Sequence, residues 1–382
     1  MPAERLREVA GFSIDRVAEA AGNDPEVLRL ENYDTDLRPP PAAIEATRRA
    51  VDSDEDNSYL PFLGRDSLRA AVAGHLQALC GRTYDPGLEV AICAGATEGM
   101  LDVLLATVDP GDEVILTDPT YAGMINRVRL AGGLPRLVPF VETAGAWKLD
   151  LEKLRSAVTG RTRMLFLMNP AMPNGAVFAD EDWKAVAELC DRHNLWLLYN
   201  AAMERILYDG RRYRHPASLE ALAPHTITLG SVSKEYRMIG WRIGWIVGPR
   251  VVMADVAKVR IYNVVTPPGV TQMGALAALT TADDGIAACV AEWQGRRDVV
   301  LQELQGLRML PAGGGWSMVL DVSEFGVDGA GASEGLLARG KVAVTPMKNW
   351  GERNSDAFVR LVFSNEPAAR LHGLRQRVLH SF

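Results

Sequence analysis

The segment with the most evident chemistry reads GSVSKEYRMIGWRIGW, from Gly230 to Trp245. Ser231 and Ser233 lie two residues apart, so in an extended chain both side chains project to the same side. Lys234 follows directly, and Arg242 comes eight residues later. Two hydroxyls and a guanidinium can bind a phosphate, and a lysine beside an anion site can form a Schiff base with a carbonyl compound. By itself the pattern is common, and most loop lysines are simply solvated.

Two further segments add groups that suit a planar, anionic ligand. AGATEGMLDVLLATV reads as a strand end, a glycine turn and a helix start, and the free N–H groups at such a helix start, near Ala96 and Thr97, can bind anions. Tyr121, in DPTYAG, is an aromatic residue at another strand end, where it can stack on a planar ring or fill the core. Each of these patterns also occurs in plain strand–helix turns.

Buried strands alternate with helical patterns from Glu89 to Gly248, and these elements must position the polar groups. The apolar runs are EVAICAGAT, DEVILTDPTY, LPRLVPF, RMLFLMNP, LWLLYN, TITLGSVSK and RIGWIVG. Short runs rich in Val, Ile and Leu, separated by amphipathic stretches, are typical of an α/β domain with a mainly parallel sheet. Ligands bind at the carboxyl ends of the strands in such sheets, which is where the polar residues and glycines gather.

We therefore predict an α/β protein, with a three-layer large domain around a mainly parallel, mixed sheet and a smaller α+β domain built from both termini. Its parts are an N-terminal arm and small-domain segment over residues 1–45, the large domain over 46–275 and the small C-terminal domain over 276–382. The net charge of −7 in 382 residues argues against a nucleic-acid partner. Four scattered cysteines, no signal-like N-terminal segment and no long apolar run favour a cytoplasmic protein without a membrane span, a disulfide framework or a metal site.

Taken together, these segments resemble the pyridoxal-phosphate-dependent enzymes of fold type I, in the class I/II aminotransferase family. The resemblance runs over most of the chain, and S-x-S-K-x(7)-R is its most specific mark. It implies that pyridoxal 5′-phosphate is the cofactor, that Lys234 forms the Schiff base and then shuttles a proton, and that the protein is a homodimer with shared active sites. The cofactor residues that it implies are Ala96, Thr97, Tyr121, Ser231, Ser233 and Arg242, with Tyr59 reaching the phosphate of the partner's site.

The resemblance also implies where the substrate, an L-amino acid or a similar amine, is held. Arg360, in FVRLVFS, matches the arginine that binds the substrate α-carboxylate, although outside the family a surface strand residue is the simpler interpretation. Tyr33 lies in ENYDTDLRPP, a segment that departs from the family's glycine-containing entrance loop, and we expect it near the substrate.

Three positions close to the cofactor depart from the family pattern. Counting back from Tyr208, Asn200 stands where the family has the aspartate that faces the pyridine nitrogen, and Met203 where it has a tyrosine. Met172 likewise replaces an asparagine. An aspartate favours the protonated ring, whereas an amide offers no charge, so we expect a weaker electron sink. The asparagine fits a specialised chemistry, a slow transaminase or an introduced substitution.

Transamination of an L-amino acid, through an external aldimine, is the function that we expect. β- or γ-elimination or replacement in a biosynthetic pathway is the alternative, since it also begins with removal of the Cα proton by Lys234. A non-catalytic regulatory module is a distant third.

Overall fold

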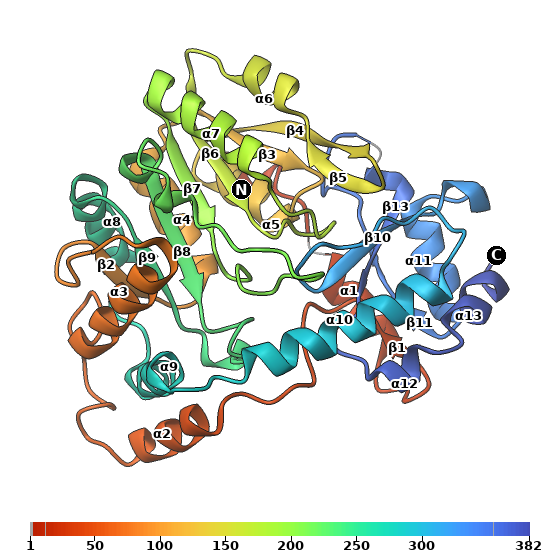
Figure 1. Cartoon of the computed structure of the whole chain (residues 1–382), viewed down its shortest axis with the longest axis horizontal. Coiled ribbons are helices and arrows are strands. Elements are labelled where there is room, and N and C mark those ends of the chain that lie inside the picture. The colour runs from red at the N-terminus through yellow and green to blue at the C-terminus, as the bar shows by residue number, and fades with distance from the viewer. Residues whose placement is uncertain (1–2, 12, 354) are drawn as a thin grey trace.

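The computed structural model describes residues 3–11, 13–353 and 355–382. It consists of a large part around a central sheet and a smaller part that contains most of the chain after residue 286 (Figure 1). The central sheet has the strand order β2-β9-β8-β7-β6-β3-β4-β5. Its strands are β2 Val90–Cys93, β3 Glu113–Asp118, β4 Leu134–Thr143, β5 Ala146–Leu149, β6 Thr162–Met168, β7 Trp196–Asn200, β8 Thr226–Ser231 and β9 Gly244–Val247.

The pairings confirm the predicted mixed, mainly parallel sheet. The run β8-β7-β6-β3-β4 is parallel, and β9 and β5 join antiparallel. The seven predicted apolar runs all form strands, and β5 is the one strand of this sheet that the sequence analysis did not predict. Leu165 and Leu197 pair across β6 and β7 and are fully buried, as expected for strands covered on both faces.

Helices cover both faces of the central sheet, because alternate strand residues point to opposite sides. Val114 and Leu116 of β3 pack with helices on one face, while Ile115 between them packs on the other. The first face carries α4 Ala96–Thr107, α5 Ala122–Leu130 and α8 Arg250–Asn263. The second face carries α3 Asp66–Cys80, α6 Leu151–Ala157, α7 Asp180–His193 and α9 Gly269–Thr280. The predicted three-layer arrangement is thereby confirmed.

The smaller part is α+β, as predicted. Its antiparallel sheet has the order β10-β13-β12, and β1, from the N-terminal segment, pairs in parallel with β11. The strands are β1 Leu28–Arg29, β10 Ser317–Asp321, β11 Val342–Ala343, β12 Thr345–Pro346 and β13 Phe358–Val362. The helices outside the central layers are α1 Ser13–Ala21, α2 Pro41–Val51, α10 Ile286–Glu303, α11 Gly329–Ala338, α12 Ala368–Leu371 and α13 Leu374–His380.

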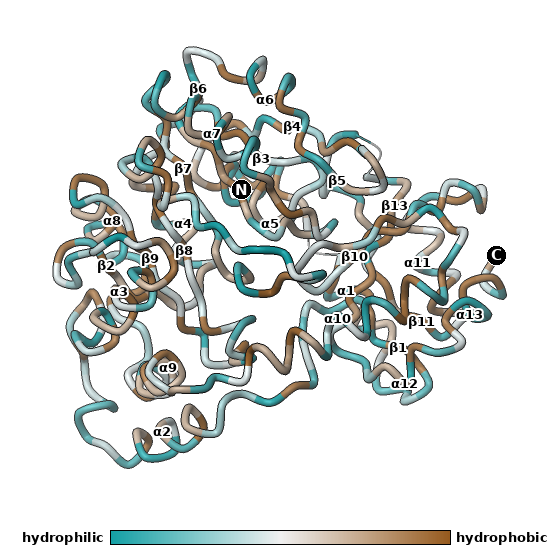
Figure 2. Tube along the Cα trace, viewed as in Figure 1, coloured by the Kyte–Doolittle hydropathy of each residue, from teal (hydrophilic) through white to brown (hydrophobic). Residues whose placement is uncertain are grey.

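Both ends of the chain contribute to the smaller part, and α10 runs from the large part into it (Figure 1). The predicted boundaries after residues 45 and 275 fall within α2 and α9 and stay predictions. Hydrophobic stretches occur on α9 in the large part and on α11 in the smaller one (Figure 2). Within the described residues, no helix is both long and apolar enough to cross a membrane.

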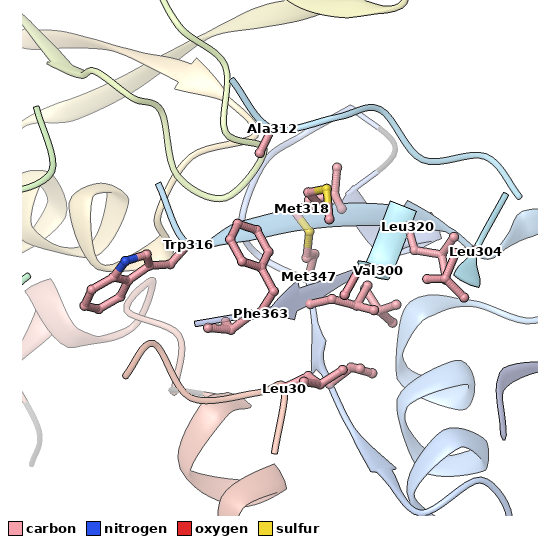
Figure 3. Packing of buried hydrophobic residues seen from close by; sticks show 14 of the residues in the cluster. Leu30, Val300, Leu304, Ala312, Trp316, Met318, Leu320, Met347 and Phe363 are labelled. Carbon is pink, nitrogen blue, oxygen red and sulfur yellow. The ribbon is translucent and has the colours of Figure 1, made fainter. Parts of the chain in front are cut away.

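The core of the smaller part extends towards the central sheet. Figure 3 shows Trp316 at one end of this core, with Phe363 next to it and Leu320 and Leu304 further along. Trp316 packs edge-on against Trp293, with ring centroids 5.0 Å apart, and is fully buried. This core therefore ends in an aromatic wall that faces the polar ends of the central strands.

Candidate active site

A cavity of about 320 Å³ opens at the carboxyl ends of the central strands, as expected for this sheet topology. Strands β6, β7 and β8 end at Met168, Asn200 and Ser231, and all three residues line the cavity. Its lining consists of Ile14, Asp15, Asn32, Tyr33, Ala96, Thr97, Met100, Tyr121, Met168, Met172, Asn200, Ala202, Met203, Ser231, Ser233, Lys234, Ile239 and Arg242. Nine of the eleven residues proposed from sequence for the site therefore share one cavity; Tyr59 and Arg360 do not line it.

One end of the cavity is an anion cradle. The Ser231 hydroxyl donates to Ser233 Oγ over 2.8 Å, and Arg242 Nη2 donates to Thr97 Oγ1 over 3.2 Å. The N-terminus of α4 points here without a side-chain cap, so its first N–H groups are available to an anion. The preceding residue, Gly95, has φ 80°, and a Cβ on it would collide with the Arg242 guanidinium. Only glycine allows this close approach of loop and arginine.

Lys234 lies in the middle of the cavity wall with its amine held by a backbone carbonyl. Its Nζ donates to the carbonyl oxygen of Tyr33 over 2.6 Å and lies 5.0 Å from the ring centroids of both Tyr33 and Trp316. Burial among these rings lowers the pKa of Lys234 to about 7, since desolvation disfavours the charged form. The cations Arg360 and Arg242 lower it further, whereas Asp34 opposes the shift. A neutral, nucleophilic amine is thus accessible near neutral pH.

Tyr33 connects the lysine with the smaller part of the protein. Its hydroxyl lies 3.1 Å from Met203 Sδ and accepts a hydrogen bond from the backbone N–H of Trp316 over 3.1 Å. Burial raises the pKa of Tyr33 to about 12, so the phenol stays protonated. Tyr33 thus lines the cavity, and its role as a substrate contact stays a prediction.

Arg360, on β13, lies behind Tyr33 and is fully buried. Its Nη2 donates to the Glu31 carbonyl oxygen and, over 3.0 Å, to Thr345 Oγ1. The guanidinium lies between two aromatic faces, 5.2 Å from the ring centroid of Tyr33 and 4.9 Å from that of Trp350. Burial lowers its pKa to about 10, so it remains a cation at neutral pH. Its Nε and Nη1 have no hydrogen-bond partner within the described chain.

A second fully buried arginine shows what is unusual about Arg360. Arg260, on α8, lies 3.6 Å from Glu98 and 3.8 Å from Asp102, so two acidic side chains face its charge; burial, together with Asp102, raises the pKa of Glu98 to about 8. No carboxylate pairs with Arg360 among the described residues. A buried cation normally requires an anion, and Arg360 keeps unpartnered N–H groups on Nε and Nη1 that a carboxylate can accept from.

Asn200 lies at the end of β7, where the count from Tyr208 puts it, and it is only 4% exposed. Its Oδ1 accepts from the Ala202 N–H over 3.1 Å, and its Nδ2 lies 3.7 Å from Met168 Sδ. A thioether is a weak acceptor, so the amide N–H groups remain available to a better one. Tyr121 lines the same cavity and packs edge-on against Trp350, with ring centroids 5.8 Å apart.

Tyr59 lies outside the cavity, in the segment between α2 and α3, and is 84% exposed. The neighbouring Phe62 is also exposed, and its carbonyl oxygen accepts from Arg260 Nη1 over 2.8 Å, which places this segment beside the end of α8. There Tyr262 is 91% exposed. Several large apolar side chains therefore gather on one surface.

The sequence analysis did not identify Ile14, Asp15, Met168 and Trp316 as parts of the site. Helix α1 supplies the first two from a segment far from the strand ends in sequence, and no local motif marks them. Trp316 reaches Lys234 only because the smaller part packs against the central sheet. Among the described residues, no group of three or more His, Cys, Asp or Glu could hold a metal ion.

The fold and the cavity define an enzyme built around a buried, activated lysine and an anion cradle. The family model for class I and II aminotransferases matches residues 25–378. A probable aspartate/prephenate aminotransferase of Thermus aquaticus is 32% identical over 337 residues, which cover 87% of this chain and 86% of that protein. An arginine–pyruvate transaminase of Pseudomonas aeruginosa is 31% identical and covers 85% of this chain and 83% of its own length.

Solved structures agree with the family match. The N-succinyldiaminopimelate aminotransferase of Mycobacterium tuberculosis superposes with a TM-score of 0.93 over all of both chains, at 29% identity. The chain belongs to the class I and II aminotransferases, and it is an enzyme of amino-acid transamination. The expected family, fold and reaction class are confirmed, and the elimination or replacement alternative is not favoured.

Proposed function

We propose that the cavity binds pyridoxal 5′-phosphate and that the enzyme uses it to move the α-amino group between an L-amino acid and a 2-oxo acid. The observation that carries this proposal is the buried Lys234 amine, with its pKa lowered to about 7, beside a phosphate-sized anion cradle in the same cavity. When bound, the cofactor would supply a carbonyl group for amines and a conjugated ring that withdraws electrons.

The residues of the cavity fit each part of this cofactor. Ser231, Ser233, Thr97 and Arg242, with the N-terminus of α4 at Ala96, suit its phosphate. Tyr121 suits a stacking contact with its ring, and Asn200 suits a hydrogen bond to the ring nitrogen without adding charge. The cavity volume of about 320 Å³ is of the size that ligand sites usually have.

Arg360 suits the α-carboxylate of the substrate. Its two free N–H groups and its lack of an acidic partner support this role. Because Tyr33 lies between Arg360 and Lys234, a carboxylate can reach the guanidinium only when the ring of Tyr33 moves.

A homodimer with shared active sites belongs to the same proposal. Tyr59 has no contact with the cavity of its own chain, and the exposed Tyr59, Phe62 and Tyr262 provide an apolar surface suited to a second copy. A cytoplasmic location is also proposed, supported by four cysteines that form no disulfide.

Half-reaction spectroscopy tests the proposed function. The purified enzyme, loaded with pyridoxal phosphate, is mixed with single L-amino acids and with the matching 2-oxo acids. We expect an amino acid to convert the visible band of the bound cofactor to that of its amine form, and a 2-oxo acid to reverse the change. Tight retention of the cofactor without conversion by any amino acid would contradict the proposal.

Subunit mixing tests the shared site. Lys234→Ala and Tyr59→Ala are each expected to be impaired. In a mixed dimer, one site carries both changes and the other carries neither, so unfolding and refolding an equal mixture should restore about a quarter of the wild-type activity. No recovery, despite confirmed mixed dimers, would place Tyr59 outside the partner's site.

A further inference from the structure

The cavity has two chemically different walls, and they belong to different packing clusters. Ala96 and Met100 pack with the helices on the first face of the central sheet, beside the anion cradle. Four other cavity residues belong to the core that contains Trp316 and Trp350: Ile14, Met168, Met172 and Met203. The second wall is therefore apolar and rich in thioethers, which adapt to ligands of irregular shape.

An amino acid held by Arg360 would place its side chain along this second wall. Tyr33 lies between Arg360 and Lys234, with its ring about 5 Å from each cation, and its hydroxyl touches Met203. The α-carboxylate of the substrate would thus occupy the Arg360 end of this path, and its α-amino group the Lys234 end. The side chain has to extend past Met203 towards the neighbouring apolar residues and α1.

The charges that remain along the cavity do not suit an acidic side chain. Of the described lining residues, only Asp15, Lys234 and Arg242 carry a charge. Lys234 is the reacting amine and Arg242 belongs to the anion cradle, which leaves Asp15, an exposed carboxylate on α1 next to the buried Ile14. Asp15 makes no ion pair or hydrogen bond within the described chain. A second substrate carboxylate would be buried against methionines and repelled by this acid.

Resting on the proposed function, we infer that the preferred amino donors are α-amino acids with an apolar stem and a neutral or cationic end, and that acidic amino acids are disfavoured. Asp15 is the residue that favours neutral or cationic substrate side chains over acidic ones. The inference separates this chain from relatives that are named for aspartate.

The first test compares donors in the half-reaction of the wild-type holoenzyme. L-Leucine, L-methionine and L-arginine are compared with L-aspartate and L-glutamate, and the apparent second-order rate constant is measured for each. We expect the first group to react at least ~10-fold faster, which corresponds to about 1.4 kcal/mol. Aspartate or glutamate as the best donor would overturn the inference but leave the proposed function intact. Conversion by none of them would overturn both.

Charge reversal identifies the residue responsible. Asp15→Lys should raise the rate constant for aspartate about 10-fold and lower that for arginine, with the rate constant for leucine changing less than either. Glu19→Lys is the matched control, because Glu19 is an exposed acid on the same helix that does not line the cavity. An equal gain for aspartate in both variants would show a general charge effect and overturn the role of Asp15.

A binding measurement without turnover completes the test. 4-Methylpentanoate and succinate resemble leucine and aspartate without the amino group, so neither can react. Calorimetry on the holoenzyme should give an affinity about 10-fold higher for 4-methylpentanoate than for succinate, and Asp15→Lys should narrow this ratio. A wild-type preference for succinate would contradict an apolar side-chain site.

Discussion

Replacement of Arg360 by methionine tests the carboxylate site with the least disturbance elsewhere. Methionine keeps an unbranched apolar side chain between the rings of Tyr33 and Trp350 but removes the guanidinium. The two unpartnered groups, Nε and Nη1, are the ones lost to a substrate. A hydrogen bond to a charged group contributes about 1.5–3 kcal/mol, and one such bond is the loss expected here, because Nε and Nη1 point to different sides of the guanidinium. We therefore expect carboxylate binding to weaken roughly 10- to 100-fold.

Stability should respond quite differently to this change. No acid pairs with Arg360, so Arg360→Met leaves no carboxylate stranded and should alter the free energy of unfolding by less than about 1.5 kcal/mol. Arg260→Met is the control: it strands Glu98 and Asp102 beside an apolar side chain and should cost about 3–5 kcal/mol. The contrast between the two fully buried arginines separates a ligand-binding cation from a structural one.

Calorimetric titration with 4-methylpentanoate measures the first effect, and urea unfolding measures the second. Cofactor affinity, obtained by equilibrium dialysis, should be unchanged in Arg360→Met. A less than tenfold loss of carboxylate affinity, or an equal loss for carboxylate and cofactor, would refute the clamp. A destabilisation as large as that of Arg260→Met would show that Arg360 has a structural role.

Four further predictions concern Lys234 and Asn200. Lys234→Ala should remove both turnover and the visible band that the bound cofactor gives with the wild-type protein; retention of both would contradict the assignment of the whole site. In the cofactor-free protein the Lys234 pKa lies near 7 rather than at 10.5, so stopped-flow cofactor uptake should accelerate as pH rises through about 7. A rate of uptake that increases only near pH 10 would refute the lowered pKa. Between pH 7 and 10.5 the unfolded chain holds more protons on Lys234 than the folded protein does, so Lys234 should make the free energy of unfolding rise with pH over that range. Asn200→Asp should raise the proton affinity of the cofactor ring nitrogen, and an unchanged ¹⁵N chemical shift of labelled cofactor would show that this position does not control it.

The strand runs and the anion cradle could be read from the sequence because their determinants are local. Ser231, Ser233, Lys234 and Arg242 lie within twelve residues, and the buried runs of Val, Ile and Leu set the strands by composition. The strand β5 was missed because AWKL has neither an apolar run nor clear alternation. Its pairing with β4, rather than its own propensity, makes it a strand.

The second wall of the cavity could not be predicted because it depends on how the two parts of the protein pack. Ile14 and Asp15 line the cavity from α1, near the start of the chain, whereas Trp316, directly before β10, lies behind the cavity beside Lys234. The burial of Arg360 is also a tertiary effect, since FVRLVFS alone reads equally well as a surface strand. Only the packed structure shows that rings cover both faces of the guanidinium.

The positions of Trp316 and Trp350 have a practical consequence for experiments on this enzyme. The indole ring of Trp316 lies 5.0 Å from the Lys234 amine, and that of Trp350 lies 4.9 Å from the Arg360 guanidinium. The emission of an indole changes with the electric field and the contacts around it. Two native fluorophores therefore lie beside the two functional groups, one at the Lys234 amine and one at the Arg360 guanidinium. Their emission can follow the two events separately in single-tryptophan variants, without any attached dye.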